Sequence, residues 1–167
     1  FRAGIKLVKT AEALEHTLPS VISKSLNKVV SKSAEEVNQL LMKTVYKLPP
    51  YKLGSRVWEF VTHAEIKGEF VRVMFDIDGK IGLWMVEKKL IEGLSRNQIK
   101  DKLALKYLPN FIVDVEIPAG VTLRKGIVNP IFGSSGERFS TQYEIVKELL
   151  PEHVDFESLF KNIRELK

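Results

Sequence analysis

The chain has 167 residues, of which 44% are hydrophobic and 28% are charged, a composition typical of one globular domain with a sizeable core. It has no cysteine, which excludes disulfides, a disulfide-linked partner, thiolate metal sites and cysteine nucleophiles. No apolar run approaches the roughly 20 residues of a membrane-spanning helix. The net charge of +5 suits an anionic partner such as nucleic acid, but the excess lies in residues 1–54, because residues 55–167 are balanced at 17 of each sign.

The first third of the chain is predicted to be helical. Apolar residues recur at helical spacing from Ile5 to Leu18, and the pattern resumes from Ser20 to Val30 after a break at Pro19. Ser33 and Glu36 have the spacing of a capping box, which opens a further helix. We expect this helix to bury Val37, Leu40, Leu41 and Val45 and to end at Pro49 and Pro50.

Residues 51–55 are predicted to be a linker, after which the apolar period changes from about 3.6 to 2. One strand is expected across Val57–Ile66 and a second across Glu69–Phe75. A turn at residues 76–79 leads into an apolar third strand that ends at Val86. The sequence therefore suggests a helical N-terminal segment, residues 1–54, and a sheet-containing domain, residues 55–167, which together could form one continuous domain.

The rest of the sequence predicts a short helix, further strands and a terminal helix. Ser95 and Gln98 form a second capping box before a short helix, and a half-buried strand follows at residues 111–117. Strands are expected at residues 121–128 and 140–147 on either side of a Gly/Ser loop at 129–139. Asp155 is expected to cap a terminal helix that runs to about Leu166. The tight connections favour antiparallel pairing, so the predicted class is α+β: N-terminal helices, a twisted antiparallel sheet and a C-terminal helix.

One stretch resembles a known group of proteins. It comprises EGLSRNQIKDKLAL at residues 92–105, DVEIPAGVTLR at 114–124, GIVNP at 126–130, a GSSG loop at 133–136 and TQYE at 141–144. This pattern resembles the C-terminal toxin domains of bacterial polymorphic toxins, including contact-dependent growth inhibition effectors. The resemblance covers about residues 90–147, a third of the chain.

The resemblance implies a metal-independent ribonuclease, often one that cuts tRNA, on a scaffold of the barnase/EndoU/colicin/RelE type. It also implies a secreted or cell-surface effector that acts in the cytoplasm of a neighbouring bacterium, with or without a host factor. A tightly bound immunity protein, expected to be acidic, would neutralise it. The start of the chain, which lacks an initiator Met, is consistent with a domain excised from a larger effector.

A metal-free ribonuclease needs a base for the 2′-hydroxyl, an acid for the leaving oxygen and cations for the phosphorane. We expect no cofactor and no metal. The sequence offers His63, Arg138, Thr141 and Tyr143 as catalytic candidates, with Arg124 and Lys102 as phosphate ligands. Each has a structural alternative, such as an exposed histidine or a solvated arginine. By strand alternation Thr141 and Tyr143 share one face, while Gln142 and Glu144 share the other.

Two other functions remain open. Residues 129–133 followed by Thr141-Gln142-Tyr143 also resemble the end of the NAD glycohydrolase toxin family, which implies an NAD glycohydrolase or ADP-ribosyltransferase. In that resemblance Arg124 would bind the diphosphate, and Gln142 would lie near the nicotinamide ribose. The third possibility is a non-enzymatic interaction module whose basic residues 1–47 dock an acidic partner.

Overall fold

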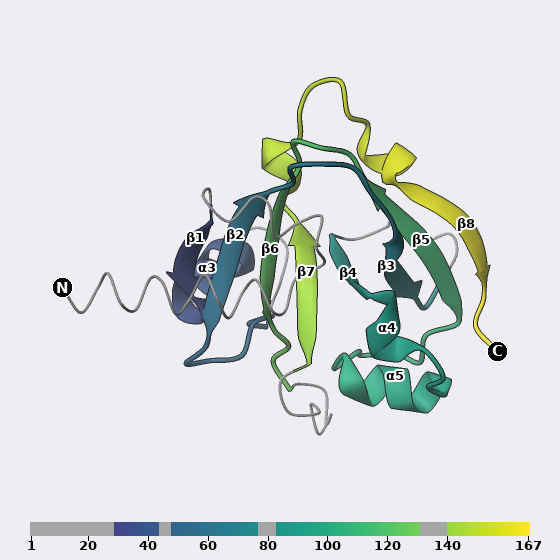
Figure 1. Cartoon of the computed structure of the whole chain (residues 1–167). Helices are drawn as coiled ribbons and strands as arrows, with labels where there is room; N and C mark the ends of the chain where they lie inside the picture. The colour runs from purple at the N-terminus through teal and green to yellow at the C-terminus, as the bar shows by residue number, and fades with distance from the viewer. Residues whose placement is uncertain (1–28, 44–47, 77–82, 131–139) are drawn as a thin grey trace.

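The computed structural model describes residues 29–43, 48–76, 83–130 and 140–167 (Figure 1). Its eight strands form one sheet in the order β1-β2-β6-β7-β4-β3-β5-β8, and each neighbouring pair is antiparallel. The strands are β1 (Val30–Ser33), β2 (Arg56–Val61), β3 (Ile66–Met74), β4 (Trp84–Glu87), β5 (Phe111–Ile117), β6 (Thr122–Ile127), β7 (Thr141–Ile145) and β8 (Phe160–Glu165).

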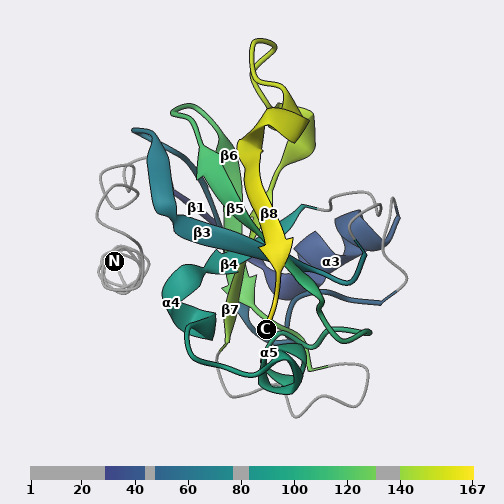
Figure 2. The same ribbon diagram turned by 90° about the vertical axis from the view of Figure 1, so that its right-hand side faces the viewer.

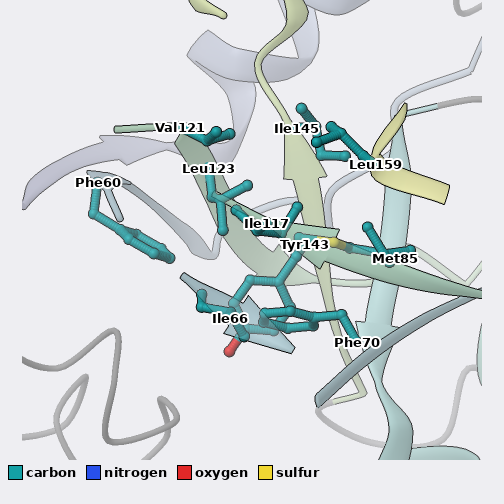
Figure 3. Close-up of a cluster of buried hydrophobic side chains, with 11 residues drawn as sticks. Phe60, Ile66, Phe70, Met85, Ile117, Val121, Leu123, Tyr143, Ile145 and Leu159 are labelled. Atoms are coloured by element: carbon teal, nitrogen blue, oxygen red, sulfur yellow. The ribbon is translucent and has the colours of Figure 1, made fainter. Parts of the chain in front are cut away.

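The sheet curves, so that its two halves face each other across the main core. Figure 1 shows β1, β2, β6 and β7 on one side and β4, β3, β5 and β8 on the other. Alternate residues from both halves point inward and meet in one cluster, which includes Phe60, Phe70, Ile117 and Tyr143 (Figure 3). Phe70 and Tyr143 pack edge to face, with ring centroids 4.7 Å apart. The inner face of the sheet is thus filled with side chains.

Short helices cover two separate parts of the outer face (Figure 2). Helix α3 (Ala34–Met42) packs Val37 and Leu41 over β2. Helices α4 (Lys88–Ile91) and α5 (Arg96–Lys102) pack over β3 and β4. No helix in the described parts of the chain has both the length and the apolar character needed to span a membrane.

The predicted capping boxes mark the starts of real helices. The Ser95 hydroxyl accepts a hydrogen bond from the Gln98 amide, and the Gln98 side chain accepts one from the Ser95 amide in return. Ser33 caps α3 by accepting from the Glu36 amide. These interactions link residues three apart, which is why the sequence alone indicates them.

The predicted fold class is nevertheless wrong. The structure is dominated by an eight-stranded antiparallel sheet, and the helices of the described residues are few and short. The described chain does not run from helices into a sheet. Strand β1 precedes α3 in the sequence and pairs with β2, which follows α3, so residues 30–43 belong to the sheet and to the helix that covers it. Residues 1–28, where the first helices are expected, lie outside the described residues.

The expected C-terminal helix is also absent from the end of the chain. Asp155 precedes a single 3₁₀ turn (Phe156–Leu159), after which β8 pairs with β5. The register shifts near Asn162, whose positive φ of 59° would interrupt an α-helix. Pairing with an open sheet edge therefore outweighs the local helical pattern, as tertiary context often does.

Candidate functional site

A pocket of about 540 Å³ opens on the outer face of the sheet, between the part covered by α3 and the part covered by α4 and α5. Strands β7, β4 and β3 form its floor, and residues 103–106 and 128–129 form its sides. The lining residues are Leu48, Pro50, Val71, Arg72, Val73, Trp84, Met85, Val86, Leu103, Ala104, Leu105, Lys106, Val128, Asn129 and Gln142. A mostly apolar hollow with a few polar groups is typical of a small-molecule site.

Two amides hold one wall of this pocket in place. Gln142 Nε2 donates a hydrogen bond to the Pro50 carbonyl at 3.0 Å, and Asn129 Nδ2 donates to the Pro49 carbonyl at 2.8 Å. The Asn129 backbone amide also donates to Pro50, at 3.2 Å. Proline carbonyls accept hydrogen bonds although proline has no N–H to donate. These bonds orient the Gln142 side chain, whose amide oxygen can accept a hydrogen bond from a ligand hydroxyl.

Tyr51 does not line the pocket but lies against Trp84, which does, and it is completely buried. Its ring lies against Gly126, where an added Cβ would be only 2.4 Å from Tyr51 Cδ1. The ring also packs edge to face on Trp84, with centroids 5.4 Å apart, and its hydroxyl donates to Glu144 Oε1 at 3.1 Å. The absence of a side chain at Gly126 thus lets Tyr51 support Trp84, the aromatic residue of the pocket.

An ionic network around the buried Arg124 and Glu144 lies next to Tyr51, beneath α3. Arg124 forms ion pairs with Glu144 at 3.2 Å and with Glu59 at 3.3 Å, and Lys32 reaches Glu59 at 3.3 Å. Burial raises the pKa of Glu144, although Arg124 and the Tyr51 hydroxyl act in the opposite direction. The Arg124 guanidinium is therefore engaged by two carboxylates of this chain, and only 5% of the residue is exposed.

A second group of titratable residues lies on the inner face. The Tyr143 hydroxyl donates to Glu87 Oε1 at 3.2 Å, and Lys125 Nζ lies 5.5 Å from the centre of the Tyr143 ring. Burial lowers the pKa of Lys125 to about 8, against the favourable charge of Glu87. Burial, together with Glu87, raises the pKa of Tyr143. Burial also raises the pKa of Glu69, with Glu87 adding to that shift and Lys89 opposing it.

The structure does not bring the described candidates for ribonuclease catalysis together. His63 lies exposed in the turn between β2 and β3, because β2 ends at Val61 rather than continuing to Ile66. Tyr143 is buried in the main core, and Thr141 is half-buried at the start of β7. Arg138 lies outside the described residues.

The expected phosphate ligands occupy two further places. Arg124 belongs to the network beneath α3, and the half-buried Lys102 is the last residue of α5. The turn that carries His63 is fixed by Thr62, whose hydroxyl donates to the Pro118 carbonyl and accepts from the Val121 amide. These two hydrogen bonds join Thr62 to residues that lie 56 and 59 positions further along the chain. The local alternating pattern therefore did not indicate the turn.

The pocket instead contains residues from the stretch that resembles the NAD glycohydrolase toxins. Asn129 and Gln142 line it together. Arg72 and Trp84, which the structure also places in the lining, were not among the candidates from the sequence. Arg72 Nη1 donates to the Trp84 carbonyl at 2.6 Å, so the two are joined at the floor of the pocket. Their signal in the sequence is weak, because an arginine and a tryptophan within strands are also typical of ordinary sheet positions.

Among the described residues, no three His, Asp or Glu side chains converge in a way that could hold a metal ion. The arrangement is that of an apolar pocket with oriented amides and a nearby lysine, Lys106, which suits a ligand that combines a planar ring with polar or anionic groups. Comparison with known proteins identifies no relative: no family model, no curated protein and no solved structure matches the chain.

Proposed function

We propose that this chain is an NAD-consuming toxin domain, either an NAD glycohydrolase or an ADP-ribosyltransferase. The observation that carries the proposal is that Gln142 lines the apolar pocket beside Asn129. Both residues belong to the stretch that resembles the NAD glycohydrolase toxins, in which the glutamine is expected near the nicotinamide ribose.

The chemistry of the pocket supports a dinucleotide better than a folded RNA. Nicotinamide and adenine are flat rings that suit apolar walls and a neighbouring tryptophan such as Trp84. Lys106, which also lines the pocket, supplies positive charge for a diphosphate. An RNA cleft needs cations along an open surface, whereas most of this lining is apolar.

In the proposed reaction the bond between ribose C1′ and the nicotinamide nitrogen breaks, and its electron pair neutralises the pyridinium. Water, or a nucleophile on a target protein, bonds to C1′ and loses a proton. The Gln142 amide is held by the Pro50 carbonyl, and its oxygen accepts a hydrogen bond from a ribose hydroxyl. Gln142 therefore orients the sugar while the leaving group departs.

The resemblance also supports the biological setting as part of this proposal. The domain would be delivered from one bacterium into the cytoplasm of another and would be neutralised by a cognate immunity protein. The net charge of +5 favours an acidic surface on that partner. Ribonuclease activity, which the resemblance first suggests, is the competing outcome of the same experiment.

The decisive experiment incubates the purified chain with NAD and, separately, with total bacterial RNA. We expect NAD to be lost with release of nicotinamide while the RNA stays intact. Gln142→Ala should lower kcat/KM for NAD by about a hundredfold, the order seen when an oriented transition-state contact is removed. Gln39→Ala, which removes an exposed glutamine of α3, is the matched control and should keep full activity.

Other outcomes would replace the proposal. RNA fragments with intact NAD would establish the ribonuclease. An unchanged rate in Gln142→Ala, with NAD still consumed, would move the site away from this pocket. Loss of neither substrate would favour the interaction module. Matching melting temperatures of the wild type and Gln142→Ala would show that a lost rate does not reflect unfolding.

A further inference from the structure

An exposed pair of aromatic rings lies next to the pocket. Phe75 and Tyr107 are each 54% exposed, although large apolar side chains are usually covered. Their ring centroids are 5.0 Å apart, and the planes are tilted by 34°. Lys106 Nζ lies 5.4 Å from the centre of the Tyr107 ring. Two rings and a cation on an open surface can stack a base and attract a phosphate.

This aromatic pair lines a hollow of about 320 Å³ that continues from the pocket. The hollow and the pocket share Arg72 and Lys106, together with two apolar residues of the same segments. Lys106 therefore lies between the Gln142 end of the pocket and the aromatic pair. One ligand could contact both ends and pass this cation.

The sheet geometry sets the length of such a ligand. Gln142 is on β7 and Arg72 on β3, with β4 between them, so they are two strand spacings apart, roughly 10 Å. Phe75 follows Arg72 by three residues, directly after the end of β3 at Met74, roughly another 10 Å. This separation exceeds the reach of one nucleotide and suits two nucleotides joined by a diphosphate.

We propose that Phe75, Tyr107 and Lys106 form the subsite for the adenine nucleotide half of the ligand. Adenine stacks on the Tyr107 ring beside Phe75, and Lys106 contacts the diphosphate. Asp76 lines the same hollow, and its carboxylate can accept a hydrogen bond from the exocyclic amine of adenine. This inference rests on the proposed NAD-consuming function and names the half of the substrate that Gln142 does not contact.

The subsite can be tested by binding, without turnover. Isothermal titration calorimetry of the full chain with ADP and with nicotinamide mononucleotide probes the two halves separately. Tyr107→Ala should weaken ADP binding about tenfold or more, since stacking contributes on that order. Nicotinamide mononucleotide should bind it as it binds the wild type. Tyr107→Phe, which keeps the ring, should retain ADP affinity, and Leu149→Ala, at an equally exposed position (55%), is the control.

The results separate the subsite from the proposed function. ADP binding that depends on Tyr107 supports the subsite, even if NAD is never hydrolysed. Equal ADP affinity in the wild type and Tyr107→Ala would overturn the subsite, while binding of nicotinamide mononucleotide that depends on Gln142 would leave the proposed function standing. If the wild type bound neither compound, both the subsite and the proposed function would be rejected.

Discussion

The side-chain amide of Asn38 forms two 2.9 Å hydrogen bonds with the backbone of Tyr51, donating to its carbonyl and accepting from its N–H. Asn38 lies on α3 and is only 3% exposed. Through this pair the helix fixes the segment that carries the Tyr51 ring, and the ring in turn supports Trp84 at the pocket. A buried polar side chain therefore links the outer helix to the wall of the candidate site.

Asn38→Ala should lower the free energy of unfolding by about 2 to 4 kcal/mol. The substitution removes both of these hydrogen bonds from a buried segment, and each loss costs about 1 to 3 kcal/mol. Urea denaturation followed by circular dichroism measures the change. Asn97→Ala, at an exposed position of α5, should change stability by less than about 0.5 kcal/mol. An equally small effect at Asn38 would contradict the linking role.

Gly126→Ala should destabilise the protein by about 1 to 3 kcal/mol, because the new methyl group would overlap the Tyr51 ring. A double-mutant cycle identifies the cause. In a Tyr51→Ala background the same substitution should cost less than about 0.5 kcal/mol, since the ring is gone. Equal costs in the two backgrounds would show that the glycine is needed for another reason. Urea denaturation of the four proteins provides the values.

Local features were predictable from the sequence, whereas the arrangement of the site was not. The capping box of Ser95 and Gln98 and the alternation of Phe111–Ile117 depend on near neighbours, and both elements form where expected. The hydrogen bond from Gln142 to Pro50 spans 92 residues. Nothing in a single sequence indicates that these two segments meet.

Arg124 illustrates the same limit. From the sequence, Arg124 was expected to bind phosphate. In the structure the register places Arg124 opposite Glu144 on β7 and Glu59 on β2, and both carboxylates engage it. Register across strands depends on turns and packing of the whole sheet, so this cross-strand triad could not be read from spacing along the chain.

Arg124→Met should reduce stability by about 3 to 5 kcal/mol at pH 7, because Glu144 would remain buried without its cation. Burial already raises the pKa of Glu144 in the folded state, and removal of Arg124 should raise it further. The folded variant would then hold a proton that the unfolded chain lacks, so the deficit should shrink from pH 7 to pH 5. Urea denaturation at both pH values tests this.

A suitable control for Arg124 is Arg164→Met. Arg164 pairs with Asp114 at 3.1 Å, but both side chains are more than one-third exposed. Its removal should therefore cost no more than about 1 kcal/mol. A similar deficit in both variants, or a deficit at Arg124 that does not change with pH, would contradict the importance of the buried network.

Lys125 should give the protein a stability that rises between pH 8 and pH 9.5. Its pKa is lowered to about 8 in the folded state, so above pH 8 the unfolded chain binds a proton that the folded chain does not, and raising the pH favours folding. Near pH 10 the raised pKa of Tyr143 acts in the opposite direction, since only the unfolded tyrosine then ionises. The rise in the free energy of unfolding should amount to about 1 to 2 kcal/mol.

Chemical denaturation across this pH range should show the rise in the wild type and in Lys161→Met, which replaces an exposed lysine as the control. If the free energy of unfolding of Lys125→Met rose with pH just as steeply, Lys125 would not be its cause.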